Sequence, residues 1–169
     1  MIRKATLEDI PKIQAIAQIA FRLTYKDILS PQQMDYMMEM MYSDASLREQ
    51  MGPQGNVFFI EEGKGYASVR FDRKLADGSD CFHLEKLYVL PGCQKTGLGR
   101  ELFGRVVEQA RSSVCGKSFR IELNVNRANP AVGFYEHIGM RKDRQGDFPI
   151  GGNFYMNDYI MAMDFTGMR

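Results

Sequence analysis

The first third of the chain carries apolar residues at the spacing of amphipathic helices. Thr6, with Asp9 three residues later, has the pattern of a capping box, and Pro11 falls in the turn that would follow. Apolar residues then recur every three or four positions, as one buried helix face requires. They are Ile10, Ile13, Ala17, Ala20 and Phe21.

Pro31 begins a second helical pattern, which is rich in methionine. Its apolar residues lie on overlapping faces of one helix. We interpret them chiefly as core. The alternative is an adaptable surface for a substrate or a second copy of the chain, because methionine repacks easily. The residues are Met34, Met37, Met38 and Met41.

From Asn56 onward the period of the apolar residues changes, and short apolar runs bounded by turn residues indicate strands. We expect strands over 57–61, 66–71, 82–90, 119–125, 140–145 and 154–165. Helices are expected from about Gly97 and from Pro130 to Gly139. This order predicts an α/β fold of the α+β type, with one mixed, mostly antiparallel central sheet flanked by helices. The length of 169 residues fits a single domain over 1–169.

The third expected strand has an irregular apolar pattern. Phe82 and Leu84 alternate regularly, but three residues separate Leu84 from Leu87. One extra residue near Glu85-Lys86 would absorb this slip as a β-bulge, which would bend the strand and open its backbone to an extended ligand. The alternative is that Lys86 faces solvent and no bulge forms.

Composition narrows the possible partners. The formal net charge is +1, with 22 basic and 21 acidic residues. We therefore expect no general electrostatic binding to nucleic acid or to an anionic membrane. Apolar runs stay well below the roughly 20 residues of a membrane helix, and a signal-peptide pattern is missing, so we expect a cytoplasmic protein. Three cysteines without CxxC spacing and two histidines predict neither a disulfide framework nor a metal site.

A Gly-containing basic turn follows the third strand. The segment 91–102 joins that strand to a helix start, where unpaired N–H groups and the helix dipole favour an anion. Gly97 and Gly99 let the backbone approach phosphate oxygens, and Lys95 and Arg100 add positive charge. The turn matches neither GxxxxGK[ST] nor GxGxxG.

The residues 94–99, Gln-Lys-Thr-Gly-Leu-Gly, resemble the Q/R-x-x-G-x-G/A motif of the GCN5-related N-acetyltransferase (GNAT) family. The resemblance implies acetyl-CoA as co-substrate without a metal. It implies a splayed central strand that pairs with the pantetheine arm, and backbone amides that cradle the pyrophosphate. The implied cofactor contacts are Leu87, Tyr88, Val89, Gln94, Lys95, Thr96, Gly97, Leu98, Gly99, Arg100, Asn129 and Tyr135.

A second stretch, 124–140, resembles the N-x-x-A-x-x-F-Y-x-x-x-G-F pattern of the same family, with Met140 in place of the aromatic residue. By this resemblance Tyr135 is the general acid for the thiolate, and Asn129 contacts the cofactor. The N–H of Val89 is a candidate oxyanion donor.

Candidates for the general base come from the strands. Glu85 lies near the expected bulge and is the candidate that deprotonates the amine; the alternative is an exposed carboxylate paired with a cation. Glu122 is a weaker rival. His83 is interpreted as structural. Because nothing resembling a base accompanies Cys93, we expect direct attack in a ternary complex.

The acceptor is less clearly encoded. Segments 21–31 and 153–163 resemble the branch related to bacterial polyamine N-acetyltransferases, which suggests spermidine or spermine as small-molecule acceptors. Negative charge for a cationic amine is available at Asp147, Asp158 and Glu61. Open alternatives are a catalytically silent acyl-CoA-binding module, a protein or peptide N-acetyltransferase, and a nucleotide-binding protein. Edge strands and the methionine-rich helix are compatible with a homodimer.

Overall fold

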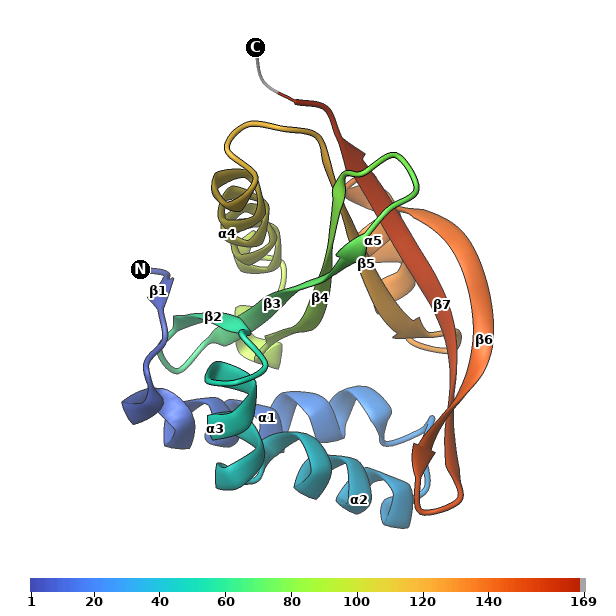
Figure 1. Cartoon of the computed structure of the whole chain (residues 1–169). Coiled ribbons are helices and arrows are strands. Elements are labelled where there is room, and N and C mark those ends of the chain that lie inside the picture. Colours follow the sequence, from blue (N-terminus) through green and yellow to red (C-terminus); the bar gives the residue numbers. More distant parts are fainter. Residues whose placement is uncertain (168–169) are drawn as a thin grey trace. The chain divides into compact units, whose positions relative to one another are not determined.

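A computed structural model describes residues 1–167 of the chain. The backbone forms a seven-stranded sheet in the order β1-β2-β3-β4-β5-β7-β6, with helices α1 to α5 (Figure 1). Two compact units divide the chain: residues 1–70 with 85–106, and residues 71–84 with 107–169. The long strands β3 (Gly65–Lys74) and β4 (Asp80–Val89) contribute to both units. Among the described residues, the helices fall short of the length and apolarity needed to cross a bilayer.

The first unit begins with β1 (Arg3–Lys4), which pairs with β2 (Val57–Glu61). Between them lie α1 (Ile10–Tyr25), α2 (Pro31–Tyr42) and α3 (Asp44–Met51). Serine hydroxyls cap the starts of α2 and α3: Ser30 accepts from the N–H of Gln33, and Ser43 from that of Ser46. Each bond satisfies one of the orphan donors at a helix start.

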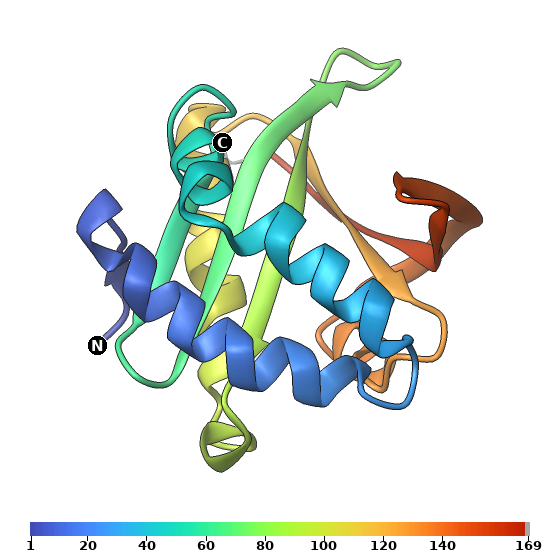
Figure 2. The ribbon, with the colours of Figure 1, turned by 90° about the horizontal axis from the view of Figure 1, so that it is seen from below.

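The helices cover both faces of the strands in this unit. Viewed in Figure 2, α1 and α2 cross one face of β2 and β3, and the start of α4 (Leu98–Ser113) lies behind them. Adjacent residues of β2 point to these opposite faces: Phe58 packs near Lys86, and Phe59 lies under the Arg105 guanidinium of α4. Met34, Met37 and Met38 are buried, which favours the core interpretation of the stripe, while Met41 is half-buried.

The second unit is built on β5 (Phe119–Asn126), β6 (Arg141–Gly151) and β7 (Phe154–Phe165). β5 and β6 both pair antiparallel with β7, and the short α5 (Ala131–His137) follows β5. Phe119 stacks on Phe165 at 4.7 Å between ring centroids, and Arg111 of α4 lies over both rings. This face of β5 is therefore apolar and covered.

The ladder between β4 and β5 is short. It is parallel and pairs Asp80–His83 with Phe119–Glu122, although β4 continues to Val89 and β5 to Asn126. A parallel pair inside an otherwise antiparallel sheet is the mixed, mostly antiparallel arrangement that the sequence predicts. The ladder ends immediately before the expected bulge.

Side-chain contacts within the first unit indicate a bulge at Glu85-Lys86. Tyr66 and Arg70 share one face of β3 by alternation. Glu85 pairs with Arg70, while Lys86 contacts the Tyr42 ring on the same side. Two consecutive residues thus direct their side chains to one face, as a bulge requires. The alternative that Lys86 faces solvent is wrong, because only 6% of the residue is exposed.

Several elements differ from the sequence-based expectation; β3, for example, ends at Lys74 rather than at residue 71. β1 and α3 were not expected, and β6 extends to Gly151 rather than ending near residue 145. β6 is mostly exposed and carries little apolar periodicity, so its pairing with β7 defines it. The division into two compact units leaves the single domain over 1–169 a prediction.

Candidate active site

The turn between β4 and α4 has the backbone geometry of an anion-binding nest. The φ angle alternates in sign, from −69° at Gln94 to +64° at Lys95, and reaches +87° at Gly97. Alternation of this kind turns successive N–H groups toward one concave side. Lys95 adopts a left-handed conformation that is uncommon for a residue with a side chain, which is typical of functional turns.

The N–H groups of this turn are available to a ligand. Glu101 is the first residue here whose N–H reaches a helical acceptor, the Gly97 carbonyl at 3.0 Å. Among residues 1–167, the N–H groups of positions 95 to 100 have no backbone acceptor. The turn is exposed, and a Cβ added at Gly97 would meet no atom within 4 Å. The geometry therefore fits a phosphate or pyrophosphate group.

The end of β4 directs one edge of its backbone away from β3. The N–H of Leu90 donates to the Lys64 carbonyl at 2.8 Å, so by strand alternation the N–H of Val89 points to the opposite edge. Gly65 allows this close pairing, because a Cβ there would lie 2.7 Å from the Tyr88 carbonyl oxygen. The Tyr88 ring packs against Tyr66 and Phe21, and Leu87 and Val89 are half-buried.

The Glu85 carboxylate is engaged in an ion pair with the Arg70 guanidinium. The alternative interpretation of this residue, a carboxylate paired with a cation, is therefore observed. Its partner is Arg70 rather than Lys86.

Lys86 is a buried ammonium that the sequence did not identify. Its Nζ donates to the Gln50 side-chain oxygen at 2.5 Å and lies 5.6 Å and 5.7 Å from the ring centroids of Tyr42 and Phe58. Burial lowers the pKa of Lys86 to about 8, although the charge of Glu85 opposes the shift.

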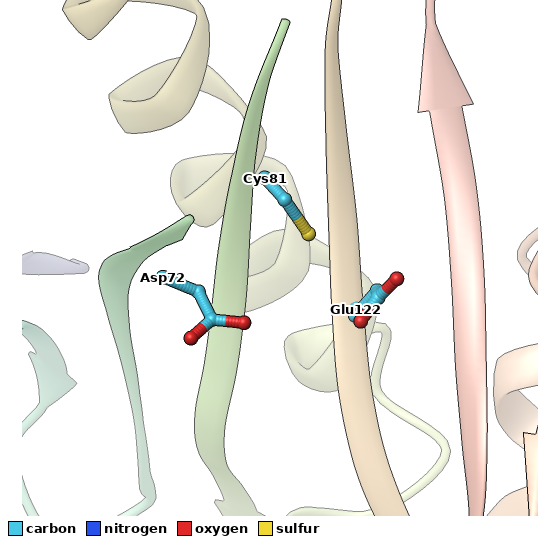
Figure 3. Close-up of side chains that lie close together, drawn as sticks. All are labelled: Asp72, Cys81 and Glu122. Carbon is cyan, nitrogen blue, oxygen red and sulfur yellow. The ribbon is translucent and has the colours of Figure 1, made fainter. Parts of the chain in front are cut away.

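In the second unit, Asp72, Cys81 and Glu122 bring two carboxylates and a thiol within 4.8 Å of one another (Figure 3). Arg73 forms two hydrogen bonds of 3.0 Å with Glu122, and Arg144 adds one of 2.9 Å. Burial alone would raise the pKa of Glu122, but these hydrogen bonds outweigh it and lower the pKa to about 2.

This cluster is poorly suited to a cation. Two guanidiniums already neutralise Glu122, and Arg73 also pairs with Asp72 at 2.7 Å. Burial raises the pKa of the Cys81 thiol to about 11, so the thiolate form that binds metals is disfavoured. The same guanidiniums make Glu122 a poor general base. His83 lies opposite Glu122 in the ladder.

The two residues that the family resemblance assigns after β5 lie at α5. Asn129 is buried, and its side-chain oxygen accepts from the N–H of Ala131 at 2.9 Å, so it shapes the entry into the helix. Tyr135 lies on α5, is 7% exposed, and packs edge-on against Phe134. Their roles toward a cofactor stay predictions.

Comparison with known proteins decides the family. The sequence profile of the acetyltransferase (GNAT) domain matches residues 25–148, well over half of the chain. The chain belongs to the GNAT acetyltransferase family. The predictions of this family, of the fold class and of an acetyltransferase activity are thereby confirmed.

Relatives of this GNAT protein are similar to it in sequence over most of their length. An uncharacterized N-acetyltransferase of Bacillus subtilis, YuaI, is 25% identical over 158 residues, covering 89% of this chain and 86% of the relative. Another from Mycobacterium tuberculosis strain H37Rv, Rv2669, is 26% identical, covering 95% of this chain and all of the relative.

Two solved structures share the fold of this GNAT protein. PaiA N-acetyltransferase from Thermoplasma acidophilum, solved with coenzyme A, superposes with a TM-score of 0.69 at 20% identity, with 98% of each chain covered. YncA from Salmonella typhimurium, a putative acetyltransferase solved with acetyl-CoA, gives 0.63 at 19% identity, covering all of this chain and 95% of the other.

Sequence reasoning located the loop of this GNAT protein but did not identify the surroundings of two buried charges. A solvent-facing Lys86 was one of two open alternatives, and the guanidiniums around Glu122 were not foreseen. The irregular apolar pattern around Lys86 was the available signal for the first. Arg73, Glu122 and Arg144 are far apart in the sequence, so only the strand order brings them together.

Proposed function

We propose that this protein transfers the acetyl group of acetyl-CoA to a primary amine, by direct attack in a ternary complex. The observation that carries the proposal is the turn at residues 94–100, whose φ alternation and unpaired N–H groups fit a diphosphate. Lys95 and Arg100 supply positive charge at its rim, and Leu87 to Val89 offer backbone groups to the pantetheine arm.

Acetyl transfer requires three further functions. The amine must lose a proton, the oxyanion at the thioester carbonyl needs a donor, and the leaving thiolate must be protonated. We assign the donor to the Val89 N–H, because it points away from β3. We assign protonation of the thiolate to Tyr135, with Asn129 as a cofactor contact. Glu85 stays the sequence-based prediction for the base.

The proposed acceptor class is a small amine, with polyamines as the first candidates. The sequence resemblance to the polyamine branch supports this choice. A polar cleft of about 470 Å³ between α1 and α2 includes Asp35 and Glu39, but Asp35 already pairs with Arg22 at 2.7 Å. A homodimer and a cytoplasmic location stay predictions.

The test is an acceptor screen with acetyl-CoA, in which release of free thiol is measured for polyamines, amino acids, aminoglycosides and peptides. We expect amine-dependent thiol release and an acetylated product. Binding of acetyl-CoA without release for any amine would indicate the catalytically silent module instead. Selective turnover of peptides would indicate the protein acetyltransferase.

Two variants test the assigned chemistry. Tyr135→Phe should lower kcat with little change in acetyl-CoA affinity, whereas Tyr159→Phe on β7 serves as a matched control. Cys93→Ala should keep its turnover, because direct attack needs no thiol. Unchanged kcat at every pH in Tyr135→Phe would remove Tyr135 from the acid role, and a correctly folded but inactive Cys93→Ala would contradict direct attack.

A further inference from the structure

Lys86 on β4 is a buried ammonium group to which the chemistry above gives no role. The residue is 6% exposed, and its Nζ donates to the Gln50 side-chain oxygen at 2.5 Å. The Gln50 amide is held in this orientation, because its Nε2 donates to the Met41 carbonyl at 2.8 Å and to the Ser46 hydroxyl at 2.9 Å. Within the first unit, a chain of hydrogen bonds therefore connects β4 to α3 and to the end of α2.

The surroundings of Lys86 compensate its charge only weakly. An ammonium has three N–H donors, and among residues 1–167 only the Gln50 side chain accepts a hydrogen bond from this one. The rings of Tyr42 and Phe58 flank Nζ, with centroids at 5.6 Å and 5.7 Å, and add a cation–π attraction. Burial nevertheless lowers the pKa of Lys86 to about 8. An apolar side chain of similar length would cost less in this place, which favours a function for the ammonium.

The position of Lys86 on β4 relates this bond to the backbone proposed for the pantetheine arm. Lys86 belongs to the bulge, and its ammonium holds the strand on the side of α3. Further along the strand, the N–H of Leu90 donates to the Lys64 carbonyl at 2.8 Å and holds the strand on the side of β3. The segment 87–89 lies between these two attachment points. Its free backbone edge therefore takes its direction from both of them.

We infer that Lys86 is a positioning residue for acetyl transfer, which holds the bulge against α3 and so directs the backbone of residues 87–89 toward the pantetheine arm and the thioester. The inference rests on the proposed function. The ammonium exchanges no proton with the amine and contacts no reacting atom. Its role is to fix the path of β4 after the bulge, and with it the place of the Val89 N–H. Loss of this attachment should affect the arm and the thioester end of acetyl-CoA but not the diphosphate.

The experiment compares Lys86→Met with Lys12→Met, a matched change at an exposed lysine of the same unit that pairs with Glu62 at 2.9 Å. Methionine nearly keeps the length of the lysine side chain and removes the ammonium. Calorimetry measures the affinity for coenzyme A and for 3′-phosphoadenosine 5′-diphosphate, which is coenzyme A without the pantetheine arm. Lys86→Met should weaken the binding of coenzyme A about tenfold and that of the arm-free compound less than about twofold, since the turn at 94–100 is unchanged.

Turnover and stability give two further readouts. With the best amine from the acceptor screen, kcat of Lys86→Met should fall about tenfold, because a misplaced reacting group lowers the rate even when the substrate is bound. Lys12→Met should match the wild type in affinity and in kcat. The melting temperature of Lys86→Met at pH 7 should be at least that of the wild type, because the buried charge is gone. A purely structural role would lower the melting temperature and would not distinguish the two compounds.

A variant of the hydrogen-bond partner tests the attachment without changing β4. Gln50→Leu removes the acceptor of the Lys86 ammonium, so it should reproduce the loss of affinity for coenzyme A. The double variant Lys86→Met/Gln50→Leu should bind coenzyme A no more weakly than the weaker of the two single variants, because the two residues act through one bond. Additive losses would show that the residues act independently, and would overturn the inference.

The remaining outcomes separate the inference from the proposed function. Unchanged coenzyme A affinity and kcat in Lys86→Met would overturn the positioning role while the proposed function stands. Equal losses for coenzyme A and the arm-free compound would do the same. If the wild type does not bind coenzyme A, or binds acetyl-CoA but releases no thiol with any amine, the proposed function itself fails, and the role of Lys86 fails with it.

Discussion

Each compact unit buries a charged side chain, and the two charges are held in opposite ways. Lys86 in the first unit has one neutral hydrogen-bond partner, Gln50, and two aromatic rings. Glu122 in the second unit is surrounded by Arg73, Arg144 and, at 3.4 Å, Arg120. Burial shifts a pKa toward the neutral form unless opposite charges prevent it. The Lys86 ammonium is therefore easily neutralised, whereas Glu122 stays ionised.

The largest effect on stability is expected when the charge of Glu122 is removed. Glu122→Gln should lower the free energy of unfolding by about 3 kcal/mol at pH 7, because two guanidiniums lose a buried partner. Urea denaturation measures the change, with Asp35→Asn, an exposed carboxylate paired with Arg22, as the control. The loss should fade between pH 4.5 and pH 2, since the folded-state pKa is lowered and its stabilisation disappears on acidification. A loss below about 1 kcal/mol at pH 7 would contradict the account.

An intermediate effect is expected from the titration of Lys86. Its folded-state pKa lies below the unfolded value of 10.5, so the unfolded chain binds more protons between pH 8 and 10.5, and stability rises with pH in that window. From pH 7 to 9.5 the free energy of unfolding of the wild type should rise by about 2 kcal/mol relative to that of Lys86→Met.

Taking the difference in the free energy of unfolding between wild type and Lys86→Met removes the contribution of the buried hydroxyls of Tyr42 and Tyr66, whose pKa values are raised by burial. Parallel stability curves for the two proteins from pH 7 to 9.5 would show that Lys86 keeps an ordinary pKa.

The smallest effect on stability is expected for the buried pair of tyrosine hydroxyls in the first unit. The hydroxyls of Tyr42 and Tyr66 share a hydrogen bond of 2.6 Å in the core. Tyr66→Phe leaves the Tyr42 hydroxyl without this partner and should cost about 1 kcal/mol. The double variant Tyr42→Phe/Tyr66→Phe should cost less than the sum of the single variants, as measured by thermal unfolding. Strict additivity would indicate that the hydroxyls do not depend on one another.

The sequence predicted elements wherever burial follows a regular period. The strands 57–61 and 154–165 were predicted with the bounds that the structure has, because their inner faces are consistently apolar. The slip between Leu84 and Leu87 left two alternatives open, a bulge or a solvent-facing Lys86, and the burial of Lys86 excludes the second. β6 was predicted too short, because an exposed edge strand takes its conformation from pairing with β7 rather than from its own pattern.

The candidate site was predicted unevenly for a related reason. The turn at 94–99 is local, so glycine spacing and the following helix were enough to locate it. The state of each carboxylate depends on arginines from other strands, which no local pattern reveals. Glu85 and Glu122 are paired with guanidiniums in the structure, and only three-dimensional contacts reveal these pairs.

The most direct test is calorimetric titration with coenzyme A and with pantetheine, which lacks the diphosphate and the 3′-phosphoadenosine. If the amides around Gly97 hold a diphosphate, coenzyme A should bind at least tenfold more tightly than pantetheine. Gly97→Val should remove most of this difference, because a β-branched residue is strained at a φ of +87°. Equal affinity for the two compounds, or no binding of coenzyme A, would contradict the account.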